Sequence, residues 1–115
     1  MTTEAVAART KLLRQELARF IEIVTQQMQP ERIILFGSFA AGQVSEWSDL
    51  DLVAIADTDL PFYQRIKRIL YSIRPQVGMD VLVYTPTEWA EMSSRRSFTQ
   101  EEILTKGRVL YARAG

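Results

Sequence analysis

The 115-residue sequence contains no cysteine and no histidine. Without cysteine the chain can form no disulfide and no iron–sulfur cluster, and without both residues it can form no Cys/His zinc site. No histidine is available as a general base. Any metal ion must therefore be bound by oxygen ligands, which favours Mg²⁺, Mn²⁺ or Ca²⁺.

The chain also lacks an excess of charge of either sign, because 14 Lys and Arg residues balance 14 Asp and Glu residues. Non-specific nucleic-acid binding needs surplus cations, so we expect no direct binding to nucleic acid. The longest apolar runs, near 33–36 and 81–84, are too short to cross a membrane, and the amino terminus does not resemble a signal peptide. We expect a cytoplasmic protein in which residues 1–115 form one domain.

Hydrophobic spacing and turn residues predict helices that alternate with strands. The predicted helices cover 4–29, a single turn at 39–41, 62–73, a short segment capped by Thr87, and 98–106. The predicted strands cover 32–36, 49–55, 77–84 and 108–111. This alternation indicates an α/β (α+β) domain, with a mixed sheet of about 3–5 strands and helices packed against it.

For the helix at 62–73, the sequence predicts both the N-cap and the environment of its charged residues. Asp59 is the expected N-cap, with Pro61 in the first turn. The charged residues Arg65, Lys67 and Arg68 are expected on a solvated face, with contact to phosphate or RNA as the alternative.

Asp49 and Asp51 begin the second predicted strand and are two residues apart. In a strand such residues point to the same face, so both carboxylates project into the same region of space. Two carboxylates placed this way repel each other, and a divalent cation between them removes the conflict. The alternative is a solvated turn, but the apolar residues from Leu52 to Ile55 indicate that the strand has already begun at Asp51.

Gly37 and Ser38 follow the first predicted strand and precede a turn of helix. Glycine allows a ligand to approach the backbone closely, and the N–H groups at the start of a helix favour anions. The Ser38 hydroxyl adds a donor for a phosphate oxygen. The alternative is an ordinary strand-to-helix turn. A covalent role for Ser38 is disfavoured because no histidine is present to activate it.

Asp80 lies inside the third predicted strand, among apolar residues. A carboxylate in such a strand needs a cationic partner or a metal ion. Two interpretations remain: Asp80 is a third metal ligand, or it is an edge-strand residue paired with Arg74 or Lys67.

Together, Gly37-Ser38, ten intervening residues, Asp49-x-Asp51 and the later Asp80 resemble the polymerase-beta-type nucleotidyltransferase superfamily. The short chain is most similar to the minimal nucleotidyltransferases that accompany a HEPN-domain partner. The resemblance implies that Gly37 and Ser38 bind the triphosphate of ATP or another nucleoside triphosphate. It implies that Asp49, Asp51 and Asp80 are catalytic ligands of two Mg²⁺ ions, and that Asp80 helps to deprotonate the acceptor hydroxyl.

One position departs from that family pattern. Many relatives have an arginine between the serine and the next glycine, where this chain has Ala41. The missing charge would have steadied the triphosphate, so Ala41 weakens the expectation of efficient turnover.

The resemblance further implies transfer of a nucleoside monophosphate, AMP from ATP, to a hydroxyl group of a partner protein. The expected partner is a HEPN-domain protein in a hetero-oligomer, with an antitoxin-like role for this chain; a homodimer is left open. The first alternative is a module with weak or no catalysis that neutralises the partner by binding alone. The second is a regulator that binds nucleotide without transferring it.

Overall fold

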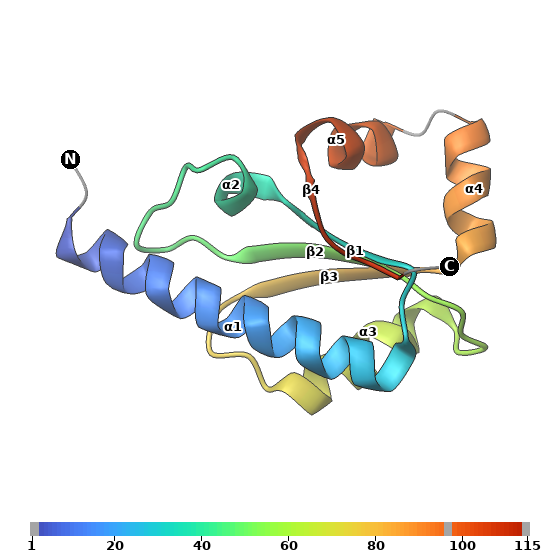
Figure 1. Cartoon of the computed structure of the whole chain (residues 1–115), viewed down its shortest axis with the longest axis horizontal. Helices are drawn as coiled ribbons and strands as arrows, with labels where there is room; N and C mark the ends of the chain where they lie inside the picture. Colours follow the sequence, from blue (N-terminus) through green and yellow to red (C-terminus); the bar gives the residue numbers. More distant parts are fainter. Residues whose placement is uncertain (1–2, 96–97, 114–115) are drawn as a thin grey trace.

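The computed structural model describes residues 3–95 and 98–113 and contains the predicted order of helices and strands (Figure 1). The helices are α1 (Glu4–Met28), α2 (Gly37–Ala40), α3 (Phe62–Ile73), α4 (Pro86–Ser94) and α5 (Phe98–Lys106). The strands are β1 (Arg32–Phe36), β2 (Leu50–Ile55), β3 (Met79–Tyr84) and β4 (Arg108–Ala112). Among the described residues, no helix has the length and apolar content needed to cross a bilayer.

The strands form one mixed sheet of four strands in the order β3-β2-β1-β4. β1 is antiparallel to both of its neighbours, and β2 is parallel to β3. The predicted α+β class with a mixed sheet is confirmed. β3 and β4 are the edge strands, so Asp80 lies on an edge.

Helices cover both faces of the sheet, α1 and α3 on one side and α4 and α5 on the other (Figure 1). Alternate residues of each strand supply the two cores, as the period of two in a strand requires. In β2, Leu52 and Ala54 pack towards α1 and α3, whereas Val53 and Ile55 pack with Trp89 of α4 and Ile103 of α5. The first core is the larger one, because α1 lies along the sheet and contributes Leu13, Phe20 and Val24.

The predicted caps of two helices are wrong. α3 has Pro61 as its N-cap with no side-chain hydrogen bond, so Asp59 does not cap it. Pro61 has extended backbone angles, and the helix begins only after it, which leaves Asp59 upstream of the capping position. α4 is capped by Thr85 and not by Thr87, since Pro86 occupies the first turn, where its missing N–H is harmless.

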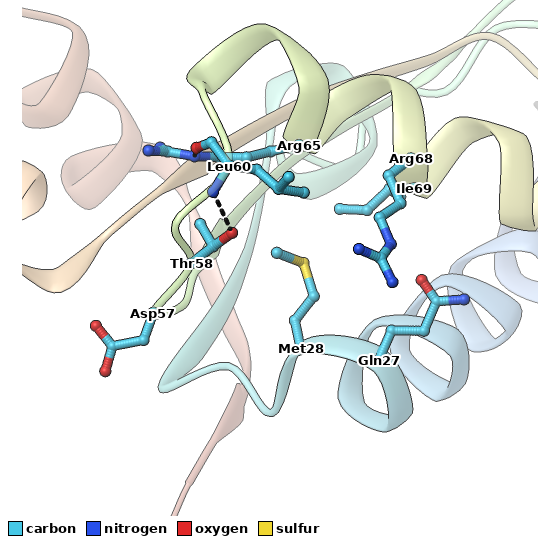
Figure 2. Close-up of a pocket in the computed structure, with 8 residues that line it drawn as sticks. All are labelled: Gln27, Met28, Asp57, Thr58, Leu60, Arg65, Arg68 and Ile69. Atoms are coloured by element: carbon cyan, nitrogen blue, oxygen red, sulfur yellow. Dashed lines mark hydrogen bonds between the residues drawn. The ribbon is translucent and has the colours of Figure 1, made fainter.

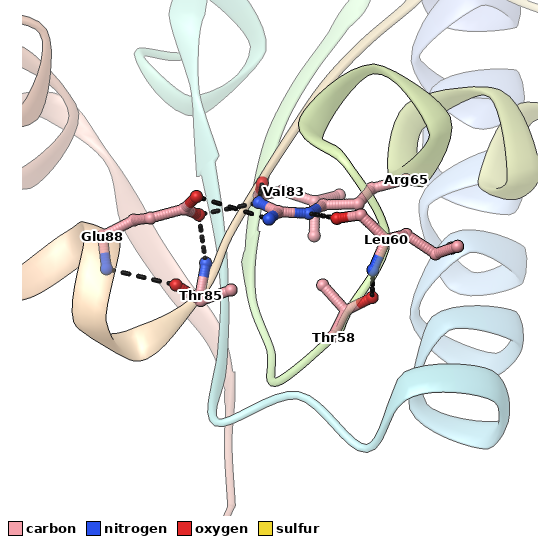
Figure 3. A network of polar contacts seen from close by, with 6 residues as sticks. All are labelled: Thr58, Leu60, Arg65, Val83, Thr85 and Glu88. Atoms are coloured by element: carbon pink, nitrogen blue, oxygen red, sulfur yellow. Dashed lines mark hydrogen bonds and ion pairs between the residues drawn. The ribbon is translucent and has the colours of Figure 1, made fainter.

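Arg65 is buried, which contradicts its expected place on a solvated face of α3. Its side chain is 7% exposed and forms an ion pair with Glu88 at 2.7 Å. The guanidinium also donates to the carbonyls of Leu60 at 2.8 Å and Val83 at 3.0 Å (Figure 3). Glu88 in turn accepts the Thr85 N–H at 2.7 Å, so one arginine joins α3, the end of β3 and the start of α4.

Candidate active site

Asp51 and Asp80 are neighbours across the parallel pair β2 and β3. The strand register places Asp51 opposite Asp80, and on the other side of β2 it places Asp51 opposite Phe36, the last residue of β1. Residues paired in register point to the same face of a sheet. Both carboxylates therefore lie on the face that α4 and α5 cover, at the end of the sheet where β1 ends and β2 and β3 begin.

Asp51 occupies an electrostatically unfavourable position. Burial is the largest factor that raises the pKa of its carboxyl above the usual value, followed by the negative charge of Asp80, a hydrogen bond from the protonated Asp51 to Asp80, and the charge of Asp49. Each of these factors penalises the ionised form of Asp51. A divalent cation among these groups would relieve the penalty, so this end of the sheet has the electrostatics of a cation site.

Asp49, just before β2, is held by a cation from a distant part of the chain. Arg9 of α1 donates from Nη2 to Asp49 Oδ1 at 3.4 Å and from Nε to the carbonyl of Ser48 at 2.8 Å. On its other side Asp49 lies against Gly78: a Cβ on Gly78 would come within 2.5 Å of Asp49 Cγ and Oδ1. The carboxylate therefore fits between a guanidinium and a bare glycine.

Gly37 packs directly against Asp51. Its φ is +77°, in the left-handed region that favours glycine, and an added Cβ would lie 2.1 Å from Asp51 Oδ2. No other residue type fits this turn without displacing the carboxylate. Ser38, the next residue, is exposed. Ala41 ends the same short helix, and it is exposed too.

The donor set fits Mg²⁺ in kind, because it consists of carboxylates that already lie close to one another. Asp51 and Asp80 meet, and Asp49 is near enough to act on the charge of Asp51. Within residues 3–95 and 98–113, however, no three acidic side chains are gathered as a ready-made metal site. The Asp49 carboxylate is instead paired with Arg9. The predicted pairing of Asp80 with Arg74 or Lys67 is not among the ion pairs of the described residues.

A separate pocket of about 130 Å³ lies at the opposite end of β2 (Figure 2). Its lining includes Asp57 and Thr58, which follow β2, together with Met28 of α1 and Arg68 of α3. Asp57 follows Asp51 by six positions, most of them in β2, which corresponds to roughly 20 Å of extended chain. This pocket is therefore not part of the acidic site.

Sequence analysis missed two residues of the site, Arg9 and Gly78. Arg9 precedes Asp49 by 40 positions and is one of several cations on α1, so no local pattern links the two. Gly78 precedes the strand that carries Asp80, yet its role is to leave room for Asp49, which depends on how β2 and β3 align.

Comparison with known proteins identifies the fold and the family. A family model described as polymerase beta, nucleotidyltransferase matches residues 19–114. No curated protein matches the sequence at a significant level. A crystal structure of a candidate nucleotidyltransferase from Sulfolobus solfataricus is similar with a TM-score of 0.67 and 14% identity, over 97% of this chain and 91% of that one.

Two toxin–antitoxin structures are also similar. One contains AMP-PNP and has a TM-score of 0.57 and 17% identity, over 84% of this chain and 73% of that chain. The other is a mutant MntA–HpeT complex with a TM-score of 0.53 and 17% identity, over 84% and 72%. At these identities the likeness shows the fold. The family match, in contrast, spans most of the 115 residues and includes Gly37, Ser38 and all three aspartates, so the chain belongs to the polymerase beta nucleotidyltransferase family.

Proposed function

We propose that this nucleotidyltransferase transfers AMP from ATP to a hydroxyl group of a partner protein and acts as the antitoxin of a toxin–antitoxin pair. The observation that carries the proposal is the Asp51–Asp80 pair beside Gly37. These two carboxylates lie side by side on neighbouring strands and disfavour each other's charge, and a cation bound between them in a nucleotidyltransferase would offset that repulsion.

Asp49, Asp51 and Asp80 are the residues that would hold two Mg²⁺ ions. Bound there, the ions would neutralise charge on the triphosphate and bring the acceptor oxygen and the α-phosphorus together. Gly37 gives the Asp51 carboxylate room against the backbone of the turn, and Ser38 would offer its exposed hydroxyl to a phosphate oxygen. The acceptor oxygen bonds to the α-phosphorus, the bond from that phosphorus to the bridging oxygen breaks, and pyrophosphate leaves. Asp80 accepts the proton of the acceptor hydroxyl.

The antitoxin role is supported by the two toxin–antitoxin structures of the same fold, one of which holds a non-hydrolysable ATP analogue. We propose a HEPN-domain protein as the partner and as the acceptor, following the family resemblance of the sequence. The two chains would form a hetero-oligomer. A small catalytic chain gains from such an arrangement because the partner itself brings the acceptor hydroxyl to the metal site.

The direct test is to incubate the protein with Mg-ATP and the product of the adjacent gene, and to weigh that product by mass spectrometry. We expect a gain of one or more AMP units. Asp51→Asn should lower the transfer rate at least about 100-fold, because it removes charge that stabilises the transition state. Asp57→Asn is the matched control: it makes the same chemical change at the other end of β2 and should leave the rate unchanged. Unmodified partner in the wild-type reaction would refute transfer to that protein.

Neutralisation of the partner by contact alone is the second candidate, and Ala41 favours it. Position 41 is exposed at the end of the Gly37–Ala40 helix and carries no cation for the triphosphate. In that case Asp49→Asn and Asp51→Asn would still neutralise the partner in a growth assay. Loss of protection in both variants would exclude this candidate.

A further inference from the structure

Arg9 joins the amino-terminal helix to the carboxylates of the site. Its side chain is 19% exposed, and its Nε–H donates to the Ser48 carbonyl at 2.8 Å. That geometry aims Nη2 at Asp49 Oδ1, 3.4 Å away. Among the described residues, this is the one ion pair that involves any of the three site aspartates. Arg9 also precedes the residues 19–114 that match the family, so the match assigns it no role.

We propose that Arg9 is a positioning residue, an internal cation that holds Asp49 in the metal-free protein and releases it when a divalent ion binds. The proposal rests on the function proposed above, because it assumes that Asp49 is a metal ligand. The Asp49 side chain is 52% exposed, contacts Arg9 and lies against Gly78. A guanidinium and a divalent cation compete for the same carboxylate oxygens, so binding one weakens binding of the other.

The two contacts of Arg9 have different fates in this scheme. The hydrogen bond to Ser48 involves a backbone carbonyl, which metal binding leaves in place, whereas the contact with Asp49 is long and partly exposed and is therefore the weaker one. After release, the guanidinium stays anchored beside the site by its Nε–H. It then remains as a positive charge beside the aspartates, whereas Ala41 carries none.

Metal affinity tests the proposal without any turnover. The experiment titrates Mn²⁺ into the metal-free protein and follows binding by electron paramagnetic resonance. Arg9→Ala should bind Mn²⁺ about two- to fivefold more tightly than the wild type, which is the competition expected from a partly exposed ion pair. Arg14→Ala is the matched control, since it removes the same charge from the same helix at a residue that forms no ion pair within the described part of the chain, and its affinity should equal that of the wild type.

Arg9→Lys adds a second measurement, because it keeps the charge and loses the fork that contacts Ser48 and Asp49 together; it should bind Mn²⁺ within about twofold of the wild type. If Arg9 only maintained the shape of the site, its removal would displace Asp49, and Arg9→Ala would bind Mn²⁺ more weakly than the wild type. Equal or weaker binding by Arg9→Ala, with measurable binding by the wild type, overturns this proposal and spares the proposed function. Absence of Mn²⁺ binding in all the proteins overturns both.

Discussion

The two ends of the sheet treat carboxylates in opposite ways. We call the end of the sheet where β3 ends and α4 begins the far end. There, the pKa of Glu88 is held below its usual value by the hydrogen bonds and charge of Arg65 and by the N–H and hydroxyl of Thr85, although burial opposes this. We call the end where β1 ends and β2 and β3 begin the near end. There, burial and two neighbouring carboxylates raise the pKa of Asp51. Glu88 has every partner it needs within the chain, whereas Asp51 has neighbours of its own sign.

This difference separates a carboxylate with a structural ion pair, Glu88, from the carboxylate that we propose as a metal ligand, Asp51. The Arg65–Glu88 pair joins α3 to α4, and each charge is neutralised by the other without a ligand (Figure 3). At the end of the sheet that carries Asp51, burial and the neighbouring carboxylates instead disfavour the ionised form of that residue. Because the two carboxylates lie at opposite ends of the sheet, substitutions can disturb each of them separately.

The largest expected effect lies at the near end and has opposite signs for activity and stability. Asp51→Asn should reduce nucleotidyl transfer at least about 100-fold, as above, yet leave the melting temperature of the metal-free protein unchanged or higher. The physical reason is that asparagine removes one of the repelling charges. Calorimetry in the presence of a chelator measures the second effect, and a clear fall in melting temperature would contradict the account of this site.

The second effect lies at the far end. Arg65→Ala should lower the free energy of unfolding by about 2–3 kcal/mol, because it strands the Glu88 carboxylate and two backbone carbonyls. Urea denaturation measures the change. Arg68→Ala on the same helix is exposed and makes no ion pair among the described residues, so it should change stability by less than about 0.5 kcal/mol. Equal effects of the two substitutions would argue against the network.

A comparison of alanine substitutions at two glycines tests the contact between Gly37 and Asp51 at the near end. Gly37 and Gly42 both have φ near +75°, but an added Cβ would meet Asp51 at the first and nothing within 4 Å at the second. Both alanine variants should lose about 1 kcal/mol of stability from backbone strain. Only Gly37→Ala should also lose transfer activity, since it displaces the carboxylate. Equal activity in the two variants would show that the contact is unimportant.

The smallest effect is a difference in pH dependence between the two ends. The folded pKa of Glu88 is lowered, so its contribution to stability is present above its usual value of 4.5 and is lost as the pH falls through the folded value. The folded pKa of Asp51 is raised from 3.8, so stability instead falls as the pH rises from there through the folded value. Glu88→Gln should flatten the acid limb of the stability curve, and Asp51→Asn should steepen it. Thermal melts between pH 3 and 7 would measure both slopes.

Local patterns in the sequence determined the elements and one half of the site. The spacing of apolar residues fixed α1 and α3 closely, because burial of one helix face imposes a regular period. The two-residue spacing of Asp49 and Asp51 and the turn at Gly37 were equally local. The predicted helix caps were wrong, since Asp59 and Thr87 are as good capping residues as Thr85 and only the course of the chain selects among them.

The tertiary structure decided which distant residues meet. The register of β2 against β3 places Asp80 beside Asp51, and no property of either strand alone sets that register. The burial of Arg65 required α4 to bring Glu88 across from another element. The contact between Arg9 and Asp49 depends on where a 25-residue helix lies along the sheet. Sequence thus specified the chemistry of each side chain and its local direction, while packing of the helices on the sheet determined its partners.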